Sequence, residues 1–311
     1  MMIGAVDIGG TKIAVGAVDE NGSILARLQS PTDARSGFAN AVQRIEDMLR
    51  EVSQMAGADL AGVGIGCTGP IDPFVGTIGN VEFLPGWDGK DLVGELRDKI
   101  HVQVAMENDA DAAALAEARW GGGRGKKSFI QVAVGTGIGA GIILDGKLYR
   151  GVDGSHPEIG HQVIDSSGPA CYCGAHGCWE SLACGPAMAG WMTGKLHTSG
   201  LNVHDLTAEM ICGLAREGDQ LARQAVDREA HYLGLGLANL VTIFAPDMIA
   251  LAGGVMKNAD LFLATIHNTI AQTCGLVPYS KTGVELASLG TESALVGAAE
   301  VWRHRFQSQG R

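Results

Sequence analysis

The chain has 311 residues, of which 46% are apolar and 18% charged, and its formal net charge is −11. This length and composition predict a large buried core divided between two domains, while the negative charge argues against nucleic acid as the main partner. No apolar run reaches the roughly 18 residues that a membrane helix needs, and the first residues lack the charged segment of a secretion signal. We therefore expect a cytoplasmic protein that binds neither membranes nor nucleic acid.

The first part of the chain predicts three strands followed by alternating helices and strands. Residues 3–28 alternate apolar and small residues and break at Gly9-Gly10 and Glu20-Asn21-Gly22, which indicates antiparallel strands joined by tight turns. Apolar residues at helical spacing predict a helix over 37–56. The elements predicted next are a strand over 60–67, a helix over 91–99, a strand over 101–108 and a helix from about Asp111 to Trp120.

The pattern starts again after the glycine-rich stretch 121–125. Residues 128–150 predict a strand, a glycine turn, a strand, an Asp-Gly turn and a strand, in the same order as residues 3–28. Such a repeat indicates an internal duplication and hence two α/β lobes. The elements predicted later are a helix over about 218–244, a strand over 248–255 and a final helix from about Glu292 to Arg305.

The stretch Asp7-Ile8-Gly9-Gly10-Thr11-Lys12 links two predicted strands and has features of a phosphate-binding loop. Glycines let backbone N–H groups approach an anion because they have no Cβ atom. Thr11 adds a hydroxyl, and Asp7 can reach Mg2+ through a water molecule. A plain hairpin turn explains the same residues when the stretch is taken alone.

The loop Gly135-Thr136-Gly137 occupies the same place in the second half. Two matched loops facing each other across a cleft would hold the two ends of one polyphosphate, so the pair favours phosphate binding. Neither loop has the G-x4-G-K-[ST] pattern, and neither opens a helix after a single strand as a dinucleotide fingerprint does. The turn Gly253-Gly254 suits a flat base lying against the backbone or a simple β-to-α turn, and the sequence leaves both open.

The segment Glu107-Asn108-Asp109-Ala110-Asp111 joins a predicted strand to a predicted helix between the two halves. Asp109 or Asp111 would suit the N-cap of that helix. Phosphoryl transfer to an alcohol needs a carboxylate that accepts the hydroxyl proton. We expect Asp111 to cap the helix and Asp109 to be catalytic.

Three of the seven cysteines have C-x-C-x4-C spacing, and these are Cys171, Cys173 and Cys178. An odd cysteine count without a secretion signal favours a metal over disulfides, and tetrahedral zinc needs a fourth ligand. We expect His161 to supply it, because His176 is tethered inside the cysteine turn and His156 is further away. Reduced cysteines without a metal are the alternative, and the other four cysteines are expected to be buried.

A site of three thiolates and one imidazole is closed to substrate, so the zinc would be structural. It would clamp the segment of Glu158 and His161 to the turn that carries Glu180. The two carboxylates would then point to one place and accept hydrogen bonds from vicinal hydroxyls, which predicts a polyol site. Solvated surface glutamates are the alternative.

Together these motifs resemble the ROK family (repressor, open reading frame, kinase), a sugar-kinase branch of the superfamily of actin, hexokinase and heat-shock chaperone ATPases. The resemblance covers essentially the whole chain. It rests on DIGGTK (7–12), ENDADAAALAE (107–117), VGTGIGAGIILDG (134–146), PEIGH (157–161), CYCGAHGCWE (171–180) and AGGV (252–255).

The resemblance implies an α/β, duplicated two-lobed actin-like (ribonuclease H-like) ATPase fold with a cleft between the lobes. The small lobe would cover residues 1–117 and be completed by the C-terminal helix 292–311. The large lobe would cover 118–291 and contain the zinc knuckle 161–178. The family also implies a homodimer or a higher oligomer.

The resemblance further implies ATP-dependent phosphorylation of the 6-hydroxyl of a hexose, with glucose first and N-acetylmannosamine or N-acetylglucosamine next. Asp109 would bind the sugar and take the hydroxyl proton, and Mg2+ would accompany ATP. The other residues implied to contact the sugar are Gly69, Asn108, Glu158, His161 and Glu180. Those implied to contact ATP are Asp7, Gly9, Gly10, Thr11, Lys12, Gly135, Thr136, Gly137, Gly253 and Gly254.

Two departures from the family pattern concern the sugar. Pro157 stands where a small residue commonly precedes E-I-G-H, and Phe83 stands where glucose-type members often have asparagine before Leu-Pro-Gly-Trp. A sugar-sensing repressor is the alternative of another class, but family repressors carry a DNA-binding segment ahead of the first glycine loop, whereas the first strand here is predicted at Ile3. A kinase that uses polyphosphate or ADP is a further alternative.

Overall fold

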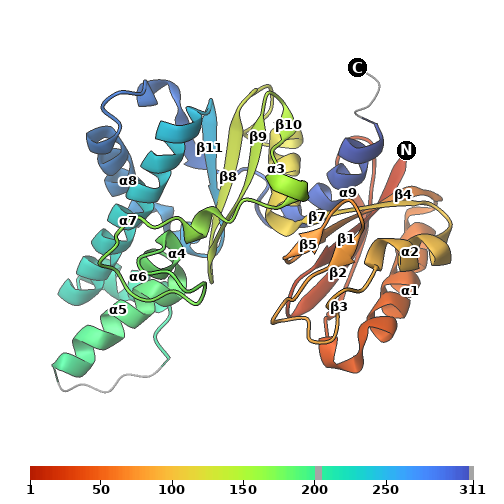
Figure 1. Ribbon diagram of the computed structural model, residues 1–311, viewed down its shortest axis with the longest axis horizontal. Helices are drawn as coiled ribbons and strands as arrows, with labels where there is room; N and C mark the ends of the chain where they lie inside the picture. The colour runs from red at the N-terminus through yellow and green to blue at the C-terminus, as the bar shows by residue number, and fades with distance from the viewer. Residues whose placement is uncertain (200–204, 308–311) are drawn as a thin grey trace.

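The computed structural model describes residues 1–199 and 205–307, and these contain two five-stranded sheets, one from each half of the chain (Figure 1). The sheet orders are β3-β2-β1-β4-β7 and β10-β9-β8-β11-β12. In each sheet three consecutive antiparallel strands are followed by two strands parallel to the first of them. The duplication predicted from the sequence is therefore confirmed by the topology.

The strands of the first sheet are β1 (Met2–Ile8), β2 (Lys12–Val18), β3 (Ile24–Pro31), β4 (Leu60–Cys67) and β7 (Gln103–Asn108). Those of the second are β8 (Phe129–Val134), β9 (Ile138–Leu144), β10 (Lys147–Leu148), β11 (Met248–Ala252) and β12 (Gly283–Leu286). A short hairpin consists of β5 (Ile71–Asp72) and β6 (Thr77–Ile78). We call the part built on the first sheet the small lobe and the part built on the second sheet the large lobe.

The helices cover the outer faces of the sheets and fill the space between them (Figure 1). Those of the small lobe are α1 (Phe38–Ala56) and α2 (Leu92–Ile100). Those of the large lobe are α4 (Trp179–Leu182), α5 (Gly185–Thr198), α6 (Ala208–Glu217), α7 (Gln220–Phe244) and α8 (Ala259–Thr273). Two more helices, α3 (Asp109–Trp120) and α9 (Ser293–Phe306), pack on each other between the sheets.

Each lobe has its own apolar core. In the small lobe, β-branched residues of β1 and β2 pack against the buried face of α1, with Trp87 fully buried at the edge. In the large lobe, β8 and β9 pack against α5, α7 and α8 around Trp179 and Phe262. Burial of this apolar area is the main force that holds each lobe together.

The C-terminal helix α9 returns to the small lobe and packs on β1 and β4. Its approach is close at Gly64, where a Cβ atom would overlap the carbonyl oxygen of Ala298. Helix α9 therefore packs on the sheet of the small lobe although it follows the whole large lobe in sequence. The last residues of the predicted helix 292–311, from 308 to 311, lie outside the described residues.

The structure differs from the sequence-based elements in three respects. Helix α3 begins at Asp109 and not at Asp111, and β11 ends at Ala252, before the two glycines. The α-helices and strands that the sequence pattern did not predict are α4, α5, α6, α8, β5, β6 and β12. Among the described helices, none combines the length and the apolar character that a membrane span requires.

Candidate active site

The first glycine loop is the turn of the β1–β2 hairpin, and buried Thr32 supports it. The amide of Gly9 donates to the carbonyl of Lys12 at 3.0 Å. Thr32 donates from its hydroxyl to Gly9 O at 2.6 Å and from its amide to Thr11 O at 3.0 Å. Thr11 and Lys12 are exposed, so the residues predicted to meet phosphate face solvent on a fixed backbone.

Phe83 packs directly on this loop. A Cβ atom on Gly10 would come within 2.7 Å of Phe83 Cβ, and Phe83 as a whole residue is 63% exposed. The aromatic residue that departs from the glucose-type pattern is therefore a neighbour of the first glycine loop.

The second glycine loop is the turn of the β8–β9 hairpin, and it is held from the large lobe. The amide of Gly135 donates to Gly137 O at 2.9 Å, and the amide of Gly185 donates to Gly135 O at 2.8 Å. The amide of Ile138 donates to a carboxylate oxygen of Glu180 at 2.7 Å. Glu180, predicted to contact sugar, thus has one oxygen engaged by this loop.

The Gly253-Gly254 turn lies beside the second loop. Gly253 has φ +96°, and a Cβ atom there would overlap the carbonyl of Val134. A Cβ atom on Gly135 would be 4.0 Å from the amide nitrogen of Gly254, whereas the space around Gly254 itself is open. The structure therefore brings together both predicted nucleotide-binding elements of the large lobe.

The start of α3 carries the predicted catalytic aspartate. Asn108 is the N-cap, and its side-chain oxygen accepts from the amide of Ala110 at 2.9 Å. Asp109 Oδ1 accepts from the same amide at 2.8 Å. The expectation that Asp111 caps the helix is wrong, because the chain turns into the helix two residues earlier and a buried Asp111 lies inside its first turn.

Other predicted residues surround this helix start. A Cβ atom on Gly69 would be 2.9 Å from the amide nitrogen of the Asn108 side chain. A Cβ atom on Gly139 would be 3.7 Å from the Cβ of Ala110. Because Gly139 is two residues after the second glycine loop, Asp109 starts its helix next to that loop.

Two carboxylates approach each other at this point. Burial and the negative charge of Asp109 raise the pKa of Asp7 to about 6, against the opposing charges of Lys12 and Arg27. Asp109 is exposed by its surface area, but desolvation by the surrounding residues raises its pKa, while the Ala110 amide and the positive charge of His156 lower it. Two acids held together in this way suit a proton acceptor and the water shell of a hard cation.

The cysteine cluster gathers four ligand atoms. The Sγ of Cys171 is 3.5 Å from the Nδ1 of His161, and the Sγ atoms of Cys173 and Cys178 are 3.5 Å apart. All four atoms lie within 4.8 Å of one another. Zinc bonds of about 2.0–2.3 Å in a tetrahedron separate ligand atoms by about 3.3–3.8 Å, so this donor set fits a metal ion.

The other histidines and cysteines lie elsewhere. His176 is exposed in the cysteine turn and outside the four-residue cluster. His156 pairs with Asp111 instead, with its Nδ1 2.9 Å from the carboxylate. The remaining cysteines are all buried, as predicted, and these are Cys67, Cys184, Cys212 and Cys274.

Tyr172 is a neighbour of the candidate sugar residues that the sequence did not single out. Its hydroxyl is 3.0 Å from the Nε2 of His161, and its ring meets that imidazole edge-on at 5.0 Å. Partial desolvation and then the negative charges of Glu180 and Glu158 raise the pKa of the phenol to about 12. The one sequence feature that could have indicated Tyr172 is its position between Cys171 and Cys173. Glu158 itself is exposed.

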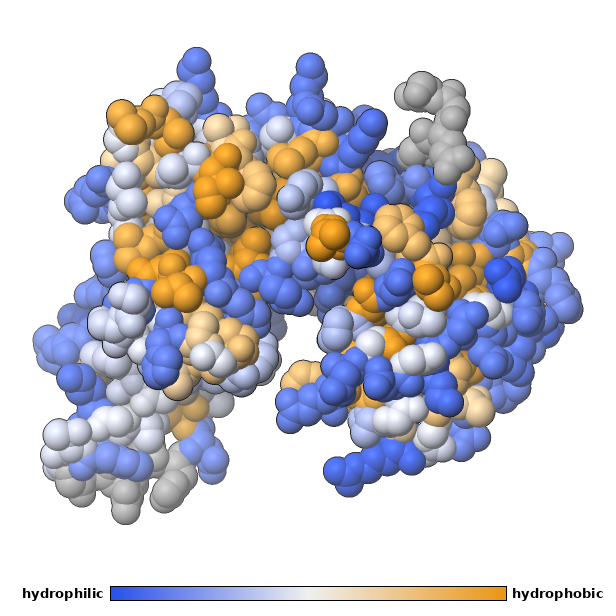
Figure 2. All heavy atoms as spheres, in the orientation of Figure 1, coloured by the Kyte–Doolittle hydropathy of each residue, from blue (hydrophilic) through white to orange (hydrophobic). Residues whose placement is uncertain are grey.

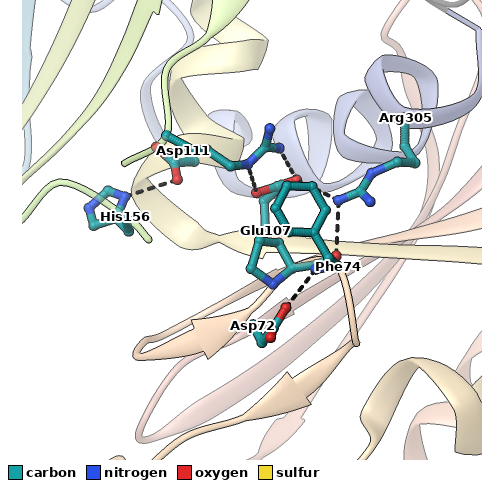
Figure 3. Close-up of polar contacts among 8 residues, drawn as sticks. Asp72, Phe74, Glu107, Asp111, His156 and Arg305 are labelled. Atoms are coloured by element: carbon teal, nitrogen blue, oxygen red, sulfur yellow. Dashed lines mark hydrogen bonds and ion pairs between the residues drawn. The ribbon is translucent and has the colours of Figure 1, made fainter. Parts of the chain in front are cut away.

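A charged brace lies behind the site (Figure 3). Buried Glu107 accepts hydrogen bonds from Arg150, whose Nε is 3.0 Å away, and from Arg305 at 3.2 Å. Both guanidinium groups lie over the ring of Phe74, at 5.7 and 5.2 Å. A Cβ atom on Gly154 would overlap that ring. The brace therefore joins the β5–β6 hairpin, β7, α9 and the segment before Glu158.

Three of the predicted site residues are linked through His156. Charge interactions link Asp7 to Asp109, Asp109 to His156, and His156 to Glu158. The molecule is hollowed between the two lobes on the side that Figure 2 shows. The residues come from the strand ends and helix starts of both lobes, as expected for a site in an interlobe cleft.

Comparison with known proteins agrees with this architecture. The family model described as "ROK family" matches residues 3–305. The glucokinase of Thermotoga maritima is 30% identical over 309 residues, which cover 97% of each chain. The ROK hexokinase structure from Thermus thermophilus has a TM-score of 0.86 at 32% identity and covers 97% of both chains.

A second solved structure is that of a ROK family glucokinase from Streptomyces griseus in complex with glucose and AMPPNP. It has a TM-score of 0.80 at 33% identity, with 97% of this chain and 99% of that chain covered. The duplicated sheets, the two glycine loops and the full-length match lead to the same conclusion: this chain belongs to the ROK family.

Proposed function

We propose that the chain is an ATP-dependent hexose kinase that phosphorylates the 6-hydroxyl of its sugar, with glucose as the preferred substrate. The position of Asp109 carries this proposal. Its carboxylate lies at the start of α3, where it interacts with the charges of Asp7 and His156. The adjoining Ala110 packs beside the strand that leaves the second glycine loop. A hydroxyl bound there would meet a proton acceptor close to the phosphate-binding elements.

In this mechanism Asp109 accepts the proton of the sugar hydroxyl. The oxygen of that hydroxyl attacks the γ-phosphorus, and ADP leaves. Backbone N–H groups of the two glycine loops donate to the phosphate oxygens and stabilise the charge of the transferring group. Asp7 would hold the water shell of a Mg2+ ion bound with ATP, and that ion would supply charge neutralisation of the phosphates.

The preference for glucose rests on the glucokinases among the relatives and on the polar groups near Asp109. Asn108 and Gly69 adjoin each other at the helix start, while Glu158, His161 and Glu180 surround Tyr172. Carboxylates and amides of this kind can bind several adjacent hydroxyls. A coupled ADP-release assay over hexoses and N-acylated hexosamines, with ATP, ADP and polyphosphate as donors, identifies the sugar and the donor.

Asp109→Asn tests the mechanism. The amide cannot accept the hydroxyl proton, so turnover should fall by roughly 100-fold or more while sugar affinity is largely kept. Asp145→Asn is the matched control, because Asp145 is exposed at a turn with φ 50°, a conformation that asparagine tolerates. Turnover of Asp109→Asn close to that of the control would remove Asp109 from this role.

We also propose that His161, Cys171, Cys173 and Cys178 bind a structural zinc ion. Three thiolates and one imidazole leave no position for substrate, so the ion would order the segment between His161 and Glu180. Cys171→Ser should lose the metal and raise the KM for sugar, and metal analysis should find about one zinc per chain before the change and none after it. His176→Asn, in the same turn but outside the cluster, should keep its zinc; loss of zinc there would contradict the ligand set.

The lobe boundaries remain a proposal, with residues 1–117 and 292–311 in the small lobe and 118–291 in the large lobe. The homodimer is likewise a proposal from the family. Sedimentation of the full chain over a range of concentrations measures the oligomeric state.

A further inference from the structure

His156 contacts the helix that carries the candidate proton acceptor. Its Nδ1 is 2.9 Å from Asp111 Oδ2 (Figure 3), and the two side chains are only 13% and 2% exposed. Asp111 is two residues after Asp109, and His156 is two residues before Glu158. One buried contact thus joins the start of α3 to the candidate sugar segment.

The imidazole of His156 is surrounded by carboxylates. Burial by itself lowers the pKa of His156, but the hydrogen bond and charge of Asp111, with the charges of Glu158 and Asp109, raise it overall. The ring is therefore a cation over more of the neutral pH range than an ordinary histidine.

The environment of Asp109 opposes its ionisation. Desolvation by the neighbouring residues raises the pKa of Asp109, although the residue is exposed by surface area, and the Ala110 amide and the positive charge of His156 act in the other direction. The other titratable groups that face Asp109 add negative charge when ionised, and these are Asp7 on β1, Cys67 on β4 and Asp111 on α3 itself. Strand β9, which also packs on the start of α3, contains no charged residue. A proton acceptor must be ionised to work, so a nearby cation has a direct effect on activity.

We propose that His156 is a positioning residue for Asp109: held by Asp111, it fixes the start of α3 relative to the segment of Glu158 and sets its imidazole near the proton acceptor. This inference rests on the proposed function, because it gives Asp109 the role of proton acceptor. It adds a residue that the sequence suggested only as a weaker candidate for a metal ligand.

His156→Asn tests the charge separately from the contact. The asparagine Nδ2 group replaces Nδ1 and can still donate to Asp111, but it carries no charge. The acid limb of kcat/KM against pH should move up by about one unit, because a neighbouring opposite charge shifts a carboxyl by that order. At pH values on the acid side of this limb, kcat/KM of the variant should be about tenfold lower than that of the wild type. At alkaline pH activity should return to the wild-type value, with the KM for sugar nearly unchanged.

The control is His101→Asn. His101 is an exposed residue at the C-cap of α2 with φ 57°, so the same substitution there leaves the fold and the pH profile unchanged. Thermal unfolding of both variants checks that they are folded, and His156→Gln serves if the asparagine variant is not. An unmoved acid limb, or an equal loss at every pH, overturns the proposal.

A double-mutant cycle separates this proposal from the proposed function. In an Asp109→Asn background there is no carboxylate left to ionise, so adding His156→Asn should have little further effect on the residual turnover. An undiminished effect in that background means that His156 does not act through Asp109. If Asp109→Asn alone keeps full turnover, the role of Asp109 in the proposed function fails first, and the role of His156 fails with it.

Discussion

The two glycine loops occupy equivalent places in the duplicated sheets but differ in how they are charged and supported. Asp7 is the next-to-last residue of β1 and pairs with Ala14, whereas Ala133 is the next-to-last residue of β8 and pairs with Gly139. The first loop is supported by the neutral hydroxyl of Thr32. The second is supported by the carboxylate of Glu180, which accepts from the loop backbone.

Because of this difference, the two loops can have different roles although they arose from one duplicated hairpin. Both hairpins present backbone N–H groups on a rigid turn, which is what a phosphate requires. Only the first hairpin contributes an acid, Asp7, whose charge interacts with Asp109. We therefore propose that the small lobe handles the proton and the cation, and that the second loop, bordered by Gly253 and Gly254, supplies uncharged backbone for the nucleotide.

Asp7→Asn should break this asymmetry with the largest effect. Loss of a carboxylate beside the cation should lower kcat/KM for Mg2+ and ATP by about 10- to 100-fold. The variant should nevertheless be more stable at pH 7. A native pKa near 6, above the ordinary value of 3.8, means that the wild type loses stability as pH rises between about 4 and 6.

Above pH 6 the free energy of unfolding of the asparagine variant should exceed that of the wild type by about 2–3 kcal/mol. Denaturant titrations of both proteins at pH 4 and pH 7 measure the difference. Equal stability at both pH values would mean that Asp7 is not strained by its surroundings. Asp145→Asn, in the exposed β9–β10 turn, should change neither activity nor pH dependence.

Gly253→Ala and Gly254→Ala compare two adjacent positions beside the second loop. At Gly253 the backbone has φ +96°, and a methyl group would overlap Val134. Gly253→Ala should therefore destabilise the protein by about 1–3 kcal/mol and raise the KM for ATP. The second adds a methyl group in open space, so stability should stay within about 0.5 kcal/mol. Thermal melts and ATP titrations check both; the reverse order of effects would contradict the packing described.

Glu180→Ala and Thr32→Val compare the two loop supports through their effects on stability. Removing Glu180 leaves the Ile138 amide without its charged acceptor, which should cost about 1–3 kcal/mol. Removing the hydroxyl of Thr32 should cost about 1 kcal/mol. Glu180→Gln keeps an acceptor and should fall between wild type and alanine. Measurement of kcat/KM for ATP and of unfolding ranks the three, and a larger loss in Thr32→Val would reverse the comparison.

Much of the fold followed from local patterns. The alternating strands and turns of residues 3–28 and 128–150 predicted both hairpin sheets, because strand period and glycine turns are properties of short segments. Apolar periodicity did not predict helix α5, because its sequence, GPAMAGWMTGKLHT, has no apolar stripe. Helix α6 does have a sequence signal, the N-cap residue Thr207, whose side chain accepts a hydrogen bond from the amide of Met210.

The site followed the same division. The spacing of Cys171, Cys173 and Cys178 pointed to a cluster, and the structure brings them together with His161. The role of Asp111 was misplaced because a helix start two residues earlier makes Asn108 the cap. Nothing local to His156 indicated a partner 45 residues away.

The amino-acid sequence by itself determined the duplicated hairpins, the glycine loops and the cysteine turn, because each depends on the backbone preferences and spacing of neighbouring residues. Only the tertiary structure decided that Asp7 interacts with the charge of Asp109, that Asp111 holds His156, and that α9 packs on β1 and β4. Those features depend on how the two sheets pack around α3 and α9. Charges brought together by such packing shift one another's pKa in ways that no local pattern carries.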